Sequence, residues 1–158
     1  LGQVRESWNL EAEEFAHVLE WAARLHEIGM LLAYHHYHKH GAYILQHADL
    51  PGFSQSDQTL LAALVQYHRR SFPAEAFGHL PRDVAPLARR LCALLRLAVV
   101  LNRARTRLPL PAVTLSTNQQ RMELRFPAGW LDEHPLTRAD LEGEARFLRK
   151  AGFRLEFA

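Results

Sequence analysis

The sequence has one cysteine, two methionines and no long uninterrupted hydrophobic run. The single thiol of Cys92 cannot form a disulfide within the chain, so a disulfide-bridged fold is excluded and a reducing cytoplasm is the expected compartment. The longest apolar stretch, residues 91–101, is interrupted by Arg96 and is too short to span a bilayer. We also find no secretory signal peptide, and because residue 1 is leucine we expect an internal piece of a longer chain.

Lysine is equally scarce, since Lys39 and Lys150 are the only two and nearly all positive charges are arginines. The net charge is only +2, but residues 82–107 contain seven arginines against one acid, Asp83. A planar guanidinium suits bidentate contacts with phosphate. A GC-rich genome would produce the same bias without any binding role, and we regard that as the larger cause of the excess.

Apolar residues recur at helical spacing through the first two thirds of the chain. Asn9 is expected to cap a first helix that ends near Gly29, and a second helix is expected over residues 35–48. Ser54 is expected to cap a third helix that ends near Arg70. A long fourth helix is expected to begin at Asp83 and to continue to about residue 106.

The pattern changes after Arg107. Apolar and polar residues alternate over 113–116 and again over 121–126, which predicts a β-hairpin, and a helix and a last strand follow before the C-terminus. The sequence therefore predicts a mainly α fold with two domains. Residues 1–106 form a helical domain, and residues 107–158 form a small α+β domain of β-β-α-β order.

Three of the predicted helices carry histidines on their apolar faces, at His26, His40 and His68. With Glu27, this set is similar to the metal site of an HD-type phosphohydrolase, in which imidazoles and carboxylates converge on a divalent ion that activates water. The expected aspartate is replaced by Glu27, and the position of a later aspartate is occupied by Val99, which has no ligand atom. We therefore predict a vestigial site without metal and without a catalytic residue. Buried core histidines are the favoured interpretation, and a polar anion-binding pocket or a working metal site are the alternatives.

Five arginines of the long helix fall on one side of it, opposite its leucines, at 100° per residue: Arg82, Arg89, Arg96, Arg103 and Arg107. A row of guanidinium groups suits a linear polyanion such as inorganic polyphosphate. No aromatic residues alternate with these arginines, which argues against nucleic-acid bases as the ligand. A solvated or intersubunit helix face is the alternative. The predicted phosphate contacts are Arg69, Arg70, Arg89, Arg96 and Arg103.

Four stretches together resemble the C-terminal half of the exopolyphosphatase / guanosine pentaphosphate phosphohydrolase family, and they cover nearly the whole chain. The longest is WAARLHEIGMLLAYHHYHKHGAYILQHADLPGF at residues 21–53. The others are LLAALVQYHRR, LCALLRLAVVLNRAR and the tail LRFPAGWLDEHPLTRADLEGEARFLRKAGFRLEF.

This resemblance implies an HD-like helical region followed by a small α+β domain. It also implies that the actin-like catalytic domains, with their Mg²⁺, precede Leu1 and are absent, and that this half holds long polyphosphate and makes homodimer contacts. The first hypothesis is thus a non-catalytic region that binds polyphosphate and supports dimerisation. The second is a metal-dependent phosphohydrolase acting on guanosine tetra- or pentaphosphate, and a third is a purely structural dimerisation module. Whether the parent enzyme prefers polyphosphate or guanosine pentaphosphate stays open.

Overall fold

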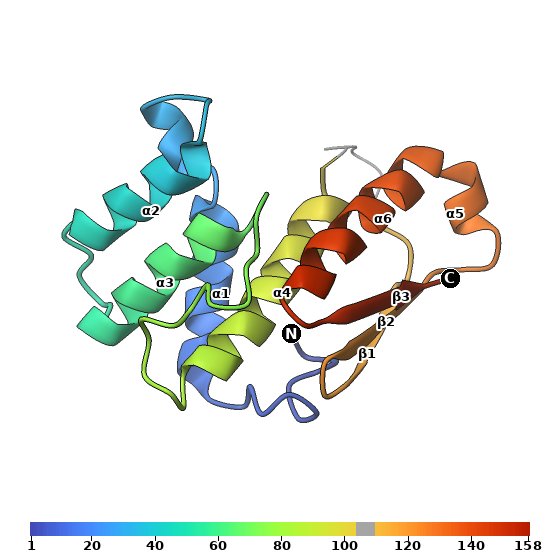
Figure 1. The fold of residues 1–158 in the computed structure, drawn as a ribbon, viewed down its shortest axis with the longest axis horizontal. Coiled ribbons are helices and arrows are strands. Elements are labelled where there is room, and N and C mark those ends of the chain that lie inside the picture. Colours follow the sequence, from blue (N-terminus) through green and yellow to red (C-terminus); the bar gives the residue numbers. More distant parts are fainter. Residues whose placement is uncertain (104–109) are drawn as a thin grey trace.

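The computed structural model describes residues 1–103 and 110–158, which form a group of helices beside a small sheet (Figure 1). The first part contains α1 (Glu13–Leu25), the 3-10 helix η1 (Ile28–Leu31), α2 (Tyr37–His47), α3 (Gln55–Tyr67) and α4 (Ala85–Leu101). The second part contains β1 (Thr114–Asn118), β2 (Arg121–Arg125), α5 (Trp130–Glu133), α6 (Pro135–Lys150) and β3 (Arg154–Phe157). The predicted mainly α fold with a small α+β end is confirmed.

The helix starts show where local sequence signals succeed and where they fail. The hydroxyl of Ser54 accepts a hydrogen bond from the main-chain N–H of Asp57 at 3.1 Å, so the predicted cap of α3 is confirmed. The predicted caps Asn9 and Asp83 are wrong. Asn9 instead makes a turn in the left-handed region at φ 53°, before α1 begins at Glu13. Asp83 lies in a turn that precedes α4.

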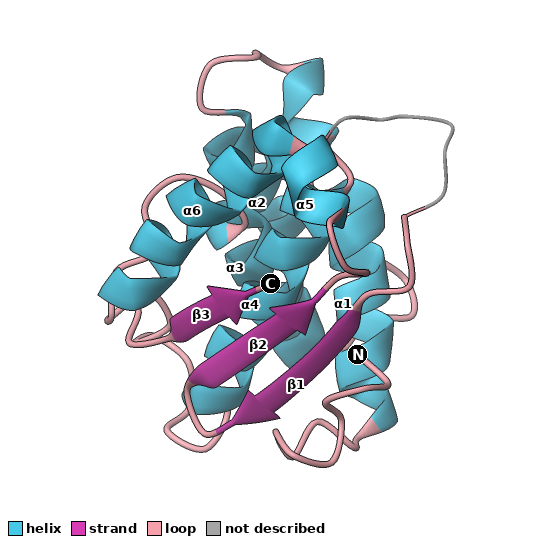
Figure 2. Cartoon of the chain, turned by 90° about the vertical axis from the view of Figure 1, so that its right-hand side faces the viewer, coloured by secondary structure: helices cyan, strands magenta, loops and turns pink. Residues whose placement is uncertain are grey.

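The sheet combines both pairing directions (Figure 2). β1 and β2 are antiparallel, as predicted for a hairpin, and the turn between them contains Gln119 at φ 51°. β3 pairs in parallel with β2, with Met122 opposite Leu155. A parallel pair needs a crossover, and α5 and α6 supply it. Because Met122 and Leu124 are buried, this sheet has an inner face against the helices.

One cluster of buried side chains joins the two parts of the chain. It includes Leu61 of α3, Leu91 of α4, Met122 of β2 and Leu148 of α6, all fully buried. The predicted boundary between residues 106 and 107 lies within 104–109, outside the described residues, so the division into 1–106 and 107–158 stays a prediction. Among the described helices, none has the length and apolar character needed to cross a membrane.

Candidate functional site

A cleft of about 790 Å³ lies where the end of α1, the segment after α3 and the end of α4 meet. Leu95 and Val99 of α4 give it an apolar wall. Charged and aromatic side chains supply the rest of its chemistry, namely those of His26, Glu27, Tyr34, Tyr37, Arg69 and Arg103. Histidine and arginine positions picked out from the sequence thus meet in one cavity.

His26 follows the last residue of α1 and is held by that helix. Its ring Nδ1 lies 2.8 Å from the carbonyl oxygen of Ala23, so Nδ1–H donates to a carbonyl that the helix end leaves without an intrahelical partner. Its Nε2 lies 4.0 Å from Glu27 Oε1. The ring of His26 is therefore fixed at one nitrogen, and the other nitrogen is available on the side of Glu27.

His68 lies behind His26, with its ring edge-on to the His26 ring at 5.1 Å between centroids. It is 2% exposed, and burial lowers its pKa to about 3, so the imidazole is neutral at physiological pH. Nδ1–H donates to the carbonyl of Val65 at 2.6 Å, which leaves Nε2 as a lone-pair acceptor. No described residue donates to that Nε2. In this state His68 offers no hydrogen to a phosphate, and its ring packs edge-on against the ring of His26.

The inward histidine of α2 is His38 and not His40, which corrects the sequence prediction. His38 is 6% exposed and its ring centroid lies 6.4 Å from that of His68. Burial, and next the nearby charge of Arg69, lower the pKa of His38 to about 4. His40 is half-buried and does not line the cleft. The buried stripe of α2 runs through residues 37, 38, 41, 42 and 45, a spacing that excludes position 40.

Two of the five predicted phosphate contacts, Arg69 and Arg103, line the cleft. The guanidinium of Arg69 lies over the ring of Tyr37, 4.5 Å from its centroid, a cation–π arrangement that orients the side chain without using its hydrogen-bond donors. Arg103 Nη1 donates to Asp140 Oδ1 at 2.5 Å, with 58% of the arginine side chain exposed. A neighbouring side chain thus orients each guanidinium, and each guanidinium still has N–H groups that could donate to a ligand.

The other three arginines lie elsewhere. Arg96 is fully buried, so its assignment as a phosphate contact is corrected: Glu144 and two main-chain carbonyls take up its guanidinium. Arg89 is half-buried and donates to the carbonyl of Ala151 at the end of α6, so it does not line the cleft either. Arg70 is exposed next to Arg69 but is not part of the cleft lining. Arg105 and Arg107 lie outside the described residues.

The donor set of the cleft does not fit a hydrolytic metal centre. His26 and Glu27 are the only residues predicted as ligands that line it, and Val99 lines it at the position where a carboxylate was expected. Over residues 1–103 and 110–158, no three His, Cys, Asp or Glu side chains are grouped so that they could hold a metal ion. Three or four protein ligands are the usual minimum for such a site. The cleft offers two guanidinium groups, one imidazole and one carboxylate.

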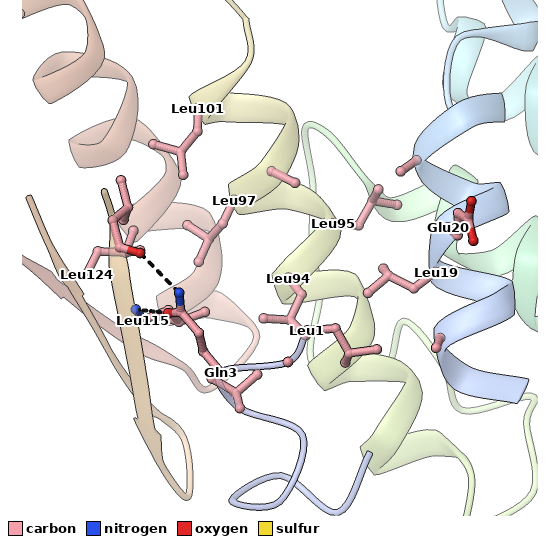
Figure 3. Close-up of a pocket in the computed structure, with 16 residues that line it drawn as sticks. Leu1, Gln3, Leu19, Glu20, Leu94, Leu95, Leu97, Leu101, Leu115 and Leu124 are labelled. Atoms are coloured by element: carbon pink, nitrogen blue, oxygen red, sulfur yellow. Dashed lines mark hydrogen bonds between the residues drawn. The ribbon is translucent and has the colours of Figure 1, made fainter. Parts of the chain in front are cut away.

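A second cavity, of about 670 Å³, lies between α1, α4, the sheet and the N-terminal segment (Figure 3). Its lining is mostly apolar and half of it is leucine, including Leu19, Leu97 and Leu124. Gln3 borders it and extends the sheet, because its Oε1 accepts from the N–H of Leu115 at 2.5 Å and its Nε2 donates to the carbonyl of Val113. Apart from Gln3 and Glu20, the described side chains that line this cavity are apolar, so the cleft is the candidate site.

Comparison with known proteins agrees with the sequence resemblance. Residues 1–145 match the family described as Ppx/GppA phosphatase, domain III. A guanosine-5'-triphosphate,3'-diphosphate pyrophosphatase of Pseudoalteromonas translucida is 37% identical over 153 residues, which are 97% of this chain and 31% of that protein. A protein of the same name from Aeromonas hydrophila is 34% identical over 151 residues, which are 96% of this chain and 30% of that protein.

The chain therefore spans less than a third of the length of the curated relatives that it matches. The family match continues from α1 into α6, so it covers the cleft and both parts of the chain that surround it. With 145 residues matched and two relatives above 30% identity across nearly all of the chain, this chain belongs to the Ppx/GppA phosphatase family.

Proposed function

We propose that this chain is the non-catalytic C-terminal region of a Ppx/GppA-type phosphohydrolase, and that its cleft binds the phosphate chain of the substrate. Inorganic polyphosphate is the ligand class. In this proposal the parent protein carries actin-like catalytic domains, with Mg²⁺, in addition to the region that this chain represents. The single observation that carries the proposal is that Arg69 and Arg103 line one cleft together with His26.

The physical chemistry of the cleft favours phosphate. Two guanidinium groups from different elements can contact successive phosphates, and each charge-assisted hydrogen bond contributes about 1.5–3 kcal/mol. Tyr37 contacts Arg69 only through its ring and leaves the donors of that guanidinium in place. Arg103 uses Nη1 on Asp140 and has its other N–H groups for a ligand. A catalytic role has less support, since Val99 replaces the second carboxylate that a metal would need.

Titration of residues 1–158 with tripolyphosphate and with long-chain polyphosphate at low and high salt tests the proposal. We expect binding that weakens steeply with salt, because the contacts are ionic. R69A and R103A should each weaken binding about tenfold, the value of one charge-assisted hydrogen bond. R82A is the matched control, since Arg82 is exposed and lies outside the cleft lining. No detectable binding at low salt, or equal effects of all three substitutions, would contradict the proposal.

The proposal includes dimerisation, which an exposed apolar segment supports. Leu31, Leu32 and Tyr34 are 82%, 63% and 76% exposed, and they lie together at the end of η1 and in the loop that follows. Contiguous exposed apolar residues are typical of an interface. Sedimentation should show a dimer whose dissociation constant rises at least tenfold in L31S/L32S. L136S is the control, because Leu136 is 83% exposed on α6. A monomer at all concentrations would remove dimerisation from the proposal.

A second candidate function is metal-dependent hydrolysis of guanosine tetra- or pentaphosphate. The observation in its favour is the His26–Glu27 pair beside the exposed aromatic ring of Tyr34, which could stack on a base. Assays with Mn²⁺ or Mg²⁺ and guanosine nucleotides separate the candidates. Turnover that H26A abolishes would favour hydrolysis. Binding without turnover, unaffected by the metal, would favour the phosphate-binding role.

A further inference from the structure

The guanidinium of Arg96 joins three elements. From α4, its Nε donates to Glu144 Oε1 on α6 at 2.5 Å, and its Nη1 donates to the carbonyl of Tyr67 at 2.5 Å. Its Nη2 donates to the carbonyl of Arg70 at 2.9 Å. The side chain is 0% exposed, so these partners are internal and no external ligand reaches it. Arg96 therefore acts on the cleft only through the groups that it holds.

The two carbonyls that Arg96 binds are on either side of His68 and Arg69. Tyr67 is the last residue of α3, and Arg70 has φ +60°, a left-handed conformation that is uncommon for a residue other than glycine. Such a conformation persists only where its surroundings hold it. Arg96 binds the segment at both ends, and the guanidinium of Arg69 is presented to the cleft between them.

Helix α6 binds buried Arg96 and one arginine of the cleft, Arg103. Glu144 binds Arg96, and Asp140, one helical turn earlier, binds Arg103 Nη1 at 2.5 Å. The two ion pairs differ in strength. Arg103 is largely exposed, and such a pair contributes at most about 1 kcal/mol. The side chains of Arg96 and Glu144 are 0% and 7% exposed, so loss of one partner would leave a buried charge.

We propose that Arg96 and Glu144 are positioning residues for the cleft, which connect the α+β part of the chain to the presentation of Arg69. This inference rests on the proposed function, since it assigns the anchor of a phosphate-contacting arginine. Glu144, held by α6, orients the planar guanidinium of Arg96. The orientation of that guanidinium then determines the positions of the Tyr67 and Arg70 carbonyls on either side of Arg69. A change in α6 is then transmitted to the cleft without any contact with the ligand.

The alternative is that the pair only stabilises the fold. The variant R96M/E144L separates the two roles, because a buried ion pair can often be replaced by apolar side chains with little loss of stability. The variant keeps an apolar contact between α4 and α6, but it removes both hydrogen bonds to the carbonyls around Arg69. R96K is the second variant. Its ammonium keeps the charge opposite Glu144 but lacks the planar fork that reaches both carbonyls.

The experiment measures tripolyphosphate affinity and the imidazole ¹H NMR shifts of His26 and His68 in residues 1–158, with urea unfolding to confirm the folded state. We expect R96M/E144L and R96K to fold, to bind about tenfold more weakly as R69A does, and to shift the resonance of His68, which lies between the held carbonyls. R82A should leave affinity and both resonances unchanged.

Wild-type affinity and unmoved resonances in a folded R96M/E144L or R96K variant would overturn the inference and leave the proposed function standing. If wild-type protein itself fails to bind tripolyphosphate, the proposed function fails, and the His68 resonance alone then decides whether Arg96 positions this segment. If R96M/E144L does not fold, the tripolyphosphate affinity and the His68 resonance of R96K decide between the two roles.

Discussion

The indole Nε1 of Trp8 donates a hydrogen bond to the main-chain carbonyl of Gln119, 2.7 Å away, and so joins the N-terminal segment to the turn of the hairpin. Trp8 is fully buried, and its ring contacts that of Phe153 at 5.8 Å between centroids. A hydroxyl contact of 2.6 Å between Ser7 and Thr117 lies next to it. The first residues of the chain are therefore part of the sheet region.

Replacement of Trp8 by phenylalanine should destabilise the protein by about 2–3 kcal/mol, because it leaves the Gln119 carbonyl without this donor and creates a small cavity. Urea unfolding measures the change. W130F is a control, since Trp130 is only half-buried and stacks on Phe126 and His134. Equal losses in the two variants would mean that the Trp8 hydrogen bond contributes nothing specific.

Gly29 allows η1 and α2 to approach each other closely. A Cβ at this position would lie 1.9 Å from the carbonyl oxygen of Tyr37 and 2.4 Å from the amide nitrogen of Gly41. G29A should therefore destabilise the fold by about 3 kcal/mol or more, since main-chain atoms must move. G143A is the matched control on α6, where the nearest atom is 3.8 Å away and alanine should stabilise the helix by up to about 1 kcal/mol. Thermal unfolding should show a lower melting temperature for G29A and an equal or higher one for G143A.

Stability should fall as the pH decreases below about 6.5, the ordinary histidine value. The pKa values of His68 and His38 are lowered to about 3 and about 4, so the unfolded chain takes up protons between pH 6.5 and these values while the folded protein does not. Each histidine then lowers the free energy of unfolding by up to about 1.4 kcal/mol per pH unit in that window. Above pH 6.5 both are neutral in either state and the effect disappears.

Urea unfolding at pH 7 and pH 5 measures this dependence, and H68Q should reduce it. H79Q is the control, because His79 is exposed. An identical pH dependence in wild type and H68Q would contradict the assignment of a neutral buried imidazole to His68.

The thiol of Cys92 should be unreactive in the folded protein. The residue is fully buried in α4, and burial raises the pKa of its thiol to about 12, so almost no nucleophilic thiolate is present at pH 8. A chromogenic thiol reagent should detect one equivalent in denaturant and none within minutes under native conditions. Rapid native labelling would show that α4 opens readily or that the packing around Cys92 is wrong.

Local patterns predicted most of the elements. The period-2 alternation over residues 113–126 gave the hairpin, and the hydroxyl of Ser54 followed by Asp57 gave a true helix start. These signals work because the interactions behind them lie within a few residues of each other. Asn9 failed as a cap because a contact from the hairpin fixes Trp8 beside it, and no local pattern contains that contact.

The candidate site was predictable in part for the same reason. His26, Glu27, Arg69 and Arg103 were chosen from the sequence and line the cleft, whereas Tyr34 and Tyr37 were not chosen. The burial of Arg96 depends on Glu144, 48 residues later, which single-helix periodicity cannot show. One signal was available, since buried Ala93 and Val100 lie on the same side of α4 as Arg96. An arginine between small apolar residues on a helix face indicates a second packing partner.

Positions 96 and 144, which form the buried ion pair, should covary among members of the family. Because either charge alone is costly inside the protein, the two positions cannot change independently. Homologous sequences should show both charged residues or two apolar ones, with mixed combinations almost absent. Positions 103 and 140, exposed and weakly coupled, should vary far more freely. Strong covariation at positions 96 and 144 and weak covariation at positions 103 and 140 would show from sequences alone which ion pair is buried.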